Sequence, residues 1–319
     1  MNNSKPKPSH PHLSICKQTF CLITAFCCFI AAQNCKAQQL FNYTQYMHNL
    51  VPVNTAAAVL EQAESVNVVI RRQLTGIEGA PSTFIFNGQL PIESIGATAG
   101  LVLLNDQFAI ERLTEINAFL AKRIRLAQGG QYLSVSLNLG IRRYTANYSS
   151  LDATDPQFRN DVRESRPNIG FGILYHSARY YLGVAVPEFT TRSLGQASLV
   201  DNSFFSSHYN FSGAYLLGDE GGEVRVKPSV LASYAKDLPL VCNFSTTLYL
   251  KSTLGLGANY RTNKEMAGIL SYTSDLLKVG YSYQFGTVNN NVVNGFRNNT
   301  HEITFTYRFG NNLGNRSLL

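Results

Sequence analysis

The chain has 319 residues, of which 45% are hydrophobic, 11% aromatic and only 15% charged, and its formal net charge is +7. The hydrophobic share excludes intrinsic disorder, which needs low hydrophobicity and high charge. Neither the glycine period of collagen nor the charged heptads of a coiled coil occur. The charged fraction lies below the roughly 25% typical of soluble domains.

The first residues have the composition of a secretory signal peptide. Three lysines and no acidic residue precede a 13-residue apolar run, Phe20 to Ala32, and small residues follow at Cys35 and Ala37, where a signal peptidase would cleave. The run is shorter than the roughly 20 residues of a transmembrane helix. We therefore expect residues 1–37 to be removed during export. A lipoprotein modified at Cys35 is the weaker alternative, because polar residues precede that cysteine.

Removal of residues 1–37 changes the charge balance. The mature chain has 282 residues, with 23 basic against 20 acidic side chains, so its net charge is +3. The basicity therefore belongs mostly to the targeting signal and does not indicate nucleic-acid binding. Five of the six cysteines leave with the signal, and Cys242 alone cannot form an intramolecular disulfide. An exported chain of this kind must draw its stability from elsewhere.

The mature chain alternates apolar and polar residues with a period of two, the pattern of β-strands with two different faces. In the segment 303–309, for example, apolar residues at odd positions alternate with polar ones at even positions. Turn-forming residues separate such segments. In chain order, about fourteen strands are predicted near 65–74, 82–90, 95–104, 112–126, 130–144, 167–177, 179–187, 207–217, 223–235, 239–250, 252–261, 265–273, 276–286 and 300–309.

The strands favour a transmembrane antiparallel β-barrel over a soluble β-sandwich. Many have the 9–11 residues that cross a bilayer when tilted, whereas sandwich strands more often have about 5–6. Short turns alternate with longer polar connections at 145–166, 188–206 and 287–299, as in outer-membrane barrels. Aromatic residues near strand ends suggest membrane girdles, namely Tyr132, Tyr144, Tyr180, Tyr181, Phe285 and Phe309. The fold class is therefore all-β, and a closed barrel leaves no sheet edge in the hydrocarbon.

Two terminal segments flank the predicted barrel of residues 65–309. Residues 38–64 fit the strand pattern poorly, and we expect them either to plug the lumen or to form an ordered cap at the periplasmic mouth. Residues 310–319 form a short C-terminal tail after a strong last strand.

Two blocks of sequence resemble the PorP/SprF family. The first runs from Tyr43 to Ala58 and is similar to the pattern Q-Y-x-x-N…N-P-A-x-A-G, and the second, from Arg71 to Thr83, is similar to R-x-Q-W-x-G-x-x-G-A-P-x-T. Thr55, Val59 and Leu74 replace the usual Pro, Gly and Trp, which indicates a divergent member. The residues that carry the resemblance are Tyr46, Asn49, Asn54, Arg71, Gln73, Gly76, Gly79, Ala80, Pro81 and Thr83.

The resemblance implies an outer-membrane barrel of Bacteroidetes-type bacteria that belongs to the type IX secretion system. Such proteins assist the export or surface retention of cargo with a C-terminal sorting domain, and some serve gliding motility. The expected partners are outer-membrane lipid, secretion-system components and such a cargo protein.

The Arg71–Thr83 block also has a reading from its residues alone. Gly76 and Gly79 suit a connection that needs positive φ, and Pro81 suits the start of the next strand. Arg71 and Gln73 are candidates for a polar contact across the lumen or to the N-terminal segment. A structural role is favoured over partner binding.

No catalytic, metal or cofactor site is predicted. His48, His176, His208 and His301 lack metal-ligand spacing, and one cysteine cannot form a thiolate zinc site. The acidic residues Asp152, Asp155, Asp161 and Glu164 are expected in a solvated loop, since they lack the order of a calcium-binding loop. No nucleophile elbow or phosphate-binding loop is present. Gly255 and Gly257 lie in a predicted strand and indicate close packing in the wall.

The sequence leaves one alternative function open. An outer-membrane channel or transporter for small or hydrophobic solutes would have the same strand pattern, and its selectivity would come from lumen residues such as Lys278, Arg308, Gln284 and Ser136. A lumen filled by residues 38–60 would count against it. An outer-membrane enzyme is the least favoured hypothesis.

Overall fold

The computed structural model describes residues 43–126, 130–150, 160–190, 207–219, 221–235, 238–286, 299–310 and 318–319. The expected signal peptide, residues 1–37, lies outside the described residues, as does most of the C-terminal tail. Among the described residues, no helix is both long and apolar enough to span a bilayer.

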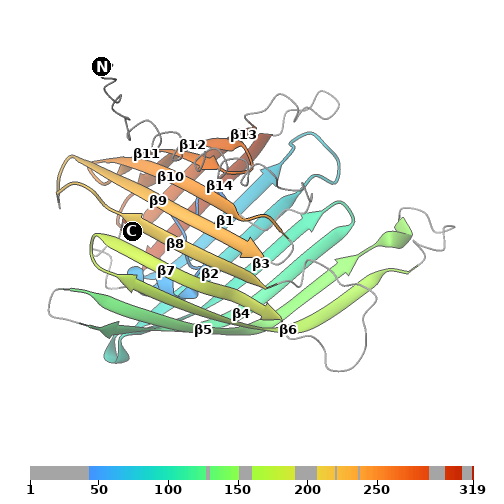
Figure 1. The fold of residues 1–319 in the computed structure, drawn as a ribbon, viewed down its shortest axis with the longest axis horizontal. Coiled ribbons are helices and arrows are strands. Elements are labelled where there is room, and N and C mark those ends of the chain that lie inside the picture. The colour runs from blue at the N-terminus through green and yellow to red at the C-terminus, as the bar shows by residue number, and fades with distance from the viewer. Residues whose placement is uncertain are drawn as a thin grey trace, which may run out of the picture. The chain divides into compact units, whose positions relative to one another are not determined.

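Fourteen antiparallel strands form a closed barrel in which each strand pairs with its neighbours in the chain, and β1 pairs with β14 (Figure 1). The strands are β1 (Glu64–Gln73), β2 (Ser82–Ile92), β3 (Ala97–Phe108), β4 (Glu111–Arg125), β5 (Tyr132–Ala146), β6 (Val162–His176), β7 (Tyr180–Thr190), β8 (His208–Tyr215), β9 (Val224–Ala235), β10 (Val241–Leu250), β11 (Leu254–Arg261), β12 (Glu265–Thr273), β13 (Leu277–Gly286) and β14 (Asn299–Phe309). Three short 3-10 helices accompany them, η1 (Thr55–Leu60), η2 (Glu93–Ile95) and η3 (Tyr148–Ser150). The predicted fold class is confirmed.

The two faces of the wall are inverted relative to a soluble protein. On β14, Ile303, Phe305 and Tyr307 are exposed on the outside, whereas Glu302 and Thr304 face inward and are buried. Exposed and buried positions also alternate on β12 and β13, and on β13 the buried positions are Lys278, Gly280, Ser282 and Gln284. Because apolar side chains cover the outside and polar ones line the interior, the wall has the character of a membrane-spanning barrel.

The two ends of the barrel differ in their connections. Short turns join β2 to β3, β4 to β5, β6 to β7, β10 to β11 and β12 to β13 at one end, which we call the short-turn end. The longest connections, after β5, β7 and β13, lie at the other end, the long-loop end. In outer-membrane barrels, short turns face the periplasm and long loops face outward.

The girdle prediction is wrong at two positions. Tyr144 and Tyr181 are fully buried and point into the barrel, because they share the parity of the inward-facing residues on β5 and β7. Phe285, by contrast, is exposed on the outer wall. Glu164 was expected in a loop, but it lies in β6, where it accepts a hydrogen bond from Arg166 Nε at 2.7 Å.

Candidate functional site in the barrel interior

The interior of the barrel is occupied by its own N-terminal residues. Residues 43–63, here called the internal segment, run through several turns and η1, and almost all of them are buried. Their apolar side chains pack with inward-facing apolar residues of the wall, including Val69, Ile85, Leu104 and Phe119, in one hydrophobic cluster. The polar wall is therefore joined to a packed chain segment by both apolar contact and hydrogen bonds.

The start of the internal segment is held by one carboxylate. Glu302 on β14 is completely buried and accepts hydrogen bonds from the backbone N–H of Thr44 at 2.8 Å and of Gln45 at 2.7 Å. The same carboxylate forms an ion pair with Arg71 Nη1 on β1 at 3.2 Å. Both oxygens are thus used, and hydrogen bonds to an ionised acceptor are stronger than neutral ones.

Side chains around Glu302 extend this anchor. Arg71 Nη1 also donates to Thr44 Oγ1 and to Gln284 Oε1, each at 3.2 Å. Thr304 Oγ1 donates to Gln45 Oε1 at 3.0 Å. Three strands, β1, β13 and β14, therefore bind two consecutive residues of the internal segment.

Two buried lysines hold the next turn. Lys227 Nζ donates to the carbonyl of Met47 at 3.0 Å, and Lys278 Nζ donates to the carbonyl of His48 at 3.3 Å. Lys227 also donates to the carbonyl of Leu318 and lies 5.6 Å from the ring centre of Tyr249. The ammonium groups therefore face carbonyl oxygens of the internal segment and of the C-terminal end.

Asparagines fix the second half of the internal segment. Asn49 Nδ2 donates to Asn87 Oδ1 on β2 at 2.6 Å. Asn54 caps η1 by accepting from the N–H of Ala56 at 3.0 Å, and its Nδ2 donates to the carbonyl of Ile173 on β6 at 3.1 Å. An N-cap side chain satisfies one of the donors that a helix start leaves free.

Inward-facing glycines make room for these contacts. A Cβ on Gly280 would lie 2.1 Å from Gln45 Oε1, and a Cβ on Gly172 would lie 2.2 Å from Asn54 Oδ1. A Cβ on Gly183 would lie 2.8 Å from Asn54 Nδ2. The wall is therefore shaped to receive the internal segment.

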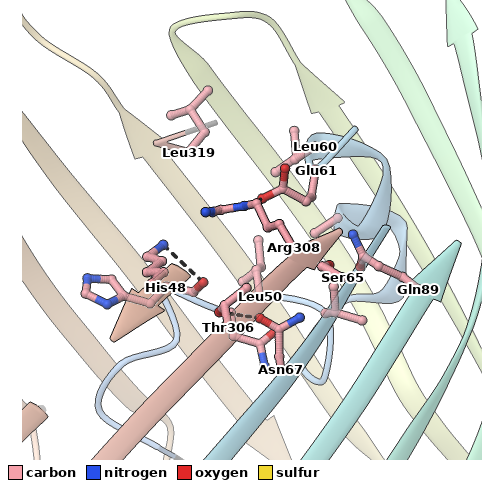
Figure 2. A pocket seen from close by; sticks show the side chains of 14 residues that line it. His48, Leu50, Leu60, Glu61, Ser65, Asn67, Gln89, Thr306, Arg308 and Leu319 are labelled. Atoms are coloured by element: carbon pink, nitrogen blue, oxygen red, sulfur yellow. Dashed lines mark hydrogen bonds and ion pairs between the residues drawn. The ribbon is translucent and has the colours of Figure 1, made fainter. Parts of the chain in front are cut away.

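A cavity of about 50 Å³ remains between the internal segment and strands β1, β13 and β14 (Figure 2). It is lined by His48 and Lys278 and by the ion pair between Arg308 Nε and Glu61 Oε2 at 2.7 Å. Both ring nitrogens of His48 lack a hydrogen-bond partner within the described protein. Burial, with Lys278 and Lys227 nearby, holds the pKa of His48 well below its usual range. The cavity has the polarity and size to hold water.

A second polar cluster lies closer to the long-loop end. Arg142 on β5 pairs with Glu115 on β4 at 3.0 Å and with Glu188 on β7 at 3.4 Å. His208 Nδ1 contacts Glu188, and Asn168 Nδ2 donates to Glu115 Oε1 at 3.2 Å. This cluster joins strands β4 to β8 across the interior.

The motif residues divide into two groups. Tyr46, Asn49, Asn54 and Arg71 meet at the internal segment; Tyr46 is fully buried, and its hydroxyl donates to the carbonyl of Asn243 at 3.3 Å. The others lie in the connection from β1 to β2 or at the strand ends beside it. Gly76 and Gly79 have φ of 101° and 73°, and the N–H of Ala80 donates to the carbonyl of Ile77 at 3.3 Å. The N–H of Gln73 donates to the carbonyl of Pro81 at 3.0 Å, and Thr83 Oγ1 donates to Asp106 Oδ1 at 2.6 Å.

The four lumen candidates of the sequence, Lys278, Arg308, Gln284 and Ser136, all face inward and are buried. Sequence reasoning did not assign a role to Glu302, Lys227 or the cluster around Arg142. In the sequence, Glu302, Lys227 and Arg142 are each a charged residue at an inward position of an alternating strand. That pattern indicates that the side chain faces the interior, but it does not indicate which residue it contacts there.

The described residues contain no group of three or more His, Cys, Asp or Glu side chains that could hold a metal ion. Cys242 is a free thiol within β10, and Gly255 and Gly257 lie within β11. Of the expected acidic loop, Asp161 accepts from Ser149 Oγ at 2.8 Å, while Asp152 and Asp155 lie outside the described residues.

Solved structures similar to this chain are outer-membrane proteins. The CymD monoaromatic hydrocarbon channel has 12% identity and a TM-score of 0.50 and covers 85% of this chain and 94% of its own. Omp33 of Acinetobacter baumannii has 11% identity and a TM-score of 0.46, with 78% of this chain and 99% of its own covered. The outer membrane phospholipase A of Escherichia coli has 12% identity and a TM-score of 0.38, with 81% and 97% covered. At 12% identity, the similarity to the CymD channel shows the fold alone.

No curated protein matches the chain. The family model described as "Type IX secretion system membrane protein PorP/SprF" matches residues 35–307, which is most of the sequence. The chain is therefore an outer-membrane β-barrel that belongs to the PorP/SprF family of type IX secretion system membrane proteins.

Proposed function

We propose that this barrel is a non-enzymatic component or cargo partner of the type IX secretion system. It assists the export or surface retention of a protein with a C-terminal sorting domain, which in some bacteria is a gliding adhesin. The observation that carries the proposal is the family match along residues 35–307.

The occupied interior supports a protein-binding role over solute passage. The internal segment forms hydrogen bonds with inward side chains of β1, β2, β9, β13 and β14 and with a backbone carbonyl of β6, so it reaches wall positions around the barrel. The described cavity beside it has a volume of about 50 Å³. A solute channel in this state would first have to displace the segment.

We also propose how the chain is processed and divided. Residues 1–37 are a signal peptide that is cleaved after Sec export, residues 38–64 form the plug, residues 65–309 form the barrel and residues 310–319 form a tail. N-terminal sequencing of the protein purified from outer membrane tests the cleavage, which is expected before Gln38.

The function is tested by deleting the gene in its host and comparing the surface and secreted proteins by mass spectrometry. We expect one or a few proteins with a C-terminal sorting domain to be lost from the surface, and a plasmid copy of the gene to restore them. General permeability, measured as sensitivity to a large antibiotic, should not change. Normal surface and secreted profiles in the deletion strain would contradict the proposal.

The alternative channel function has its own measurement. The purified barrel is inserted into planar bilayers, and its conductance is recorded. A stable open conductance of the unmodified protein would favour the channel, whereas affinity purification that recovers secretion-system subunits or an exported protein would favour the proposed role.

A further inference from the structure

The outer wall carries a compact group of arginines at the long-loop end of β4, β5 and β6. We propose that Arg112, Arg143 and Arg163, here called the arginine patch, bind the phosphate groups of glycolipids in the outer leaflet of the outer membrane. This inference does not depend on the proposed role in secretion.

The apolar band on β5 places the patch at the lipid headgroups. The outward residues of β5 from Leu133 to Ile141 are all apolar, and Ile141 is 61% exposed. These nine positions match the 9–11 residues that cross the hydrocarbon layer. Arg143 is the next outward position, so its guanidinium lies where the hydrocarbon ends. The 15-residue strands β4, β5 and β6 continue beyond that level.

The register of the three strands brings the arginines together. Thr145 on β5 pairs with Arg112 on β4 and with Arg163 on β6, so these two arginines flank it. Arg143 lies two positions further along β5 on the same face, diagonal to both. Diagonal neighbours on one face are within reach of long side chains. The three guanidinium groups therefore form a triangle.

The charges of the arginine patch are largely available. Arg143 has no hydrogen bond or ion pair with the described residues, and the Arg163 side chain is 67% exposed, with Asp161 Oδ2 at 4.0 Å. Arg112 Nη2 donates to the neutral Gln107 Oε1 at 2.9 Å. Beside the triangle, the outward residues Thr114 and Ser165 add hydroxyl groups.

Charge and position together select a lipid phosphate. Arginine forms two parallel hydrogen bonds to a phosphate group, and the long-loop end of an outer-membrane barrel faces the outer leaflet, whose glycolipids carry phosphates. At the same end, the wall from β8 to β13 instead presents exposed aromatic residues, Tyr209, Tyr234, Tyr260 and Phe285. Aromatic belts mark the membrane interface, so the arginine patch is a local basic sector at that level.

The test compares lipid binding by purified full-length barrels in detergent. The patch variant is Arg112→Gln/Arg143→Gln/Arg163→Gln, and the matched control is Lys122→Gln/Arg125→Gln/Arg179→Gln, which removes the same charge from exposed positions at the short-turn end. Monophosphorylated lipid A, its dephosphorylated form and inorganic phosphate are added, and binding is measured by native mass spectrometry. Thermal unfolding establishes that each variant is folded.

We expect the wild type and the control to bind the phosphorylated lipid about tenfold or more tightly than the dephosphorylated one, as a cluster of basic residues at a membrane surface predicts. The patch variant should lose this preference. Equal preference in the patch variant and the wild type would overturn the assignment. Full competition by inorganic phosphate would point to a free anion instead, and this result would also overturn the assignment.

Discussion

Replacing Glu302 by glutamine is expected to release the start of the internal segment while leaving the barrel closed. The carboxylate accepts from the N–H of Thr44 and of Gln45 and pairs with Arg71, all without exposure to solvent. Glutamine has nearly the same shape, but it offers one acceptor oxygen and turns an N–H₂ group toward the remaining donors. Arg71 is then left as a buried charge without its carboxylate.

The size of the effect follows from these contacts. Removing one partner of a buried ion pair costs about 3–5 kcal/mol. The lost contacts join the internal segment to the wall. Most of this cost therefore lowers the free energy needed to release the segment locally, while the barrel stays folded. Since about 1.4 kcal/mol corresponds to a factor of ten, the amides of Thr44 and Gln45 should exchange with deuterium roughly a hundred- to a thousandfold faster.

The assay is hydrogen–deuterium exchange with mass spectrometry on the purified barrel in detergent. The matched control is Glu265→Gln, because Glu265 pairs with Arg261 at 2.8 Å within the wall. That control should destabilise the wall without faster exchange at Thr44 and Gln45. Unchanged exchange in the Glu302 variant, or equal acceleration in both variants, would refute the reasoning. Arg71→Gln combined with Glu302→Gln should cost less than the sum of the single changes.

Three further changes test how the wall receives the internal segment. Gly280→Val should destabilise the folded barrel by about 1–3 kcal/mol through overpacking. Gly268→Val is the control and should have little effect, because no atom lies within 4 Å of the added Cβ. Equal melting temperatures of the two variants would contradict the close packing of the internal segment against Gly280. Asn54→Ala should cost about 1 kcal/mol through the lost N-cap, seen as faster amide exchange at Ala56, and no change there would show that the cap is dispensable. Tyr46→Ala should lower the free energy of unfolding by about 3–5 kcal/mol, and Tyr46→Phe by no more than about 1.5 kcal/mol, both measured by thermal unfolding. Similar losses in the two variants would assign the effect to the hydroxyl instead of the ring.

The strands and their faces were predictable from the sequence because their signal is local. Alternation along 303–309 determines which side chains share a face, whatever the partner strand is. The predicted strand over 265–273 has the observed bounds, and the number of strands is also confirmed. The family motifs likewise singled out Tyr46 and Arg71, both of which form hydrogen bonds between the internal segment and the wall.

The start of β6 shows where local pattern fails. The sequence predicted a polar connection over residues 145–166 and a strand only from residue 167. The strand begins at Val162, since the end of β5 pairs with it as far as Ala146. Cross-strand pairing beyond the membrane level thus extended a strand whose own sequence gave little indication of it.

The sequence by itself determined a chain of alternating strands with polar residues on one face, and its family. Only the tertiary structure decided what that polar face binds. Thr44 and Glu302 are separated by 258 positions, and Lys227 on β9 donates a hydrogen bond to the carbonyl of Met47. Such pairs depend on the closure of the barrel and on the path of the internal segment through it. A period of two residues encodes the direction of each side chain, but not which distant side chain it will meet.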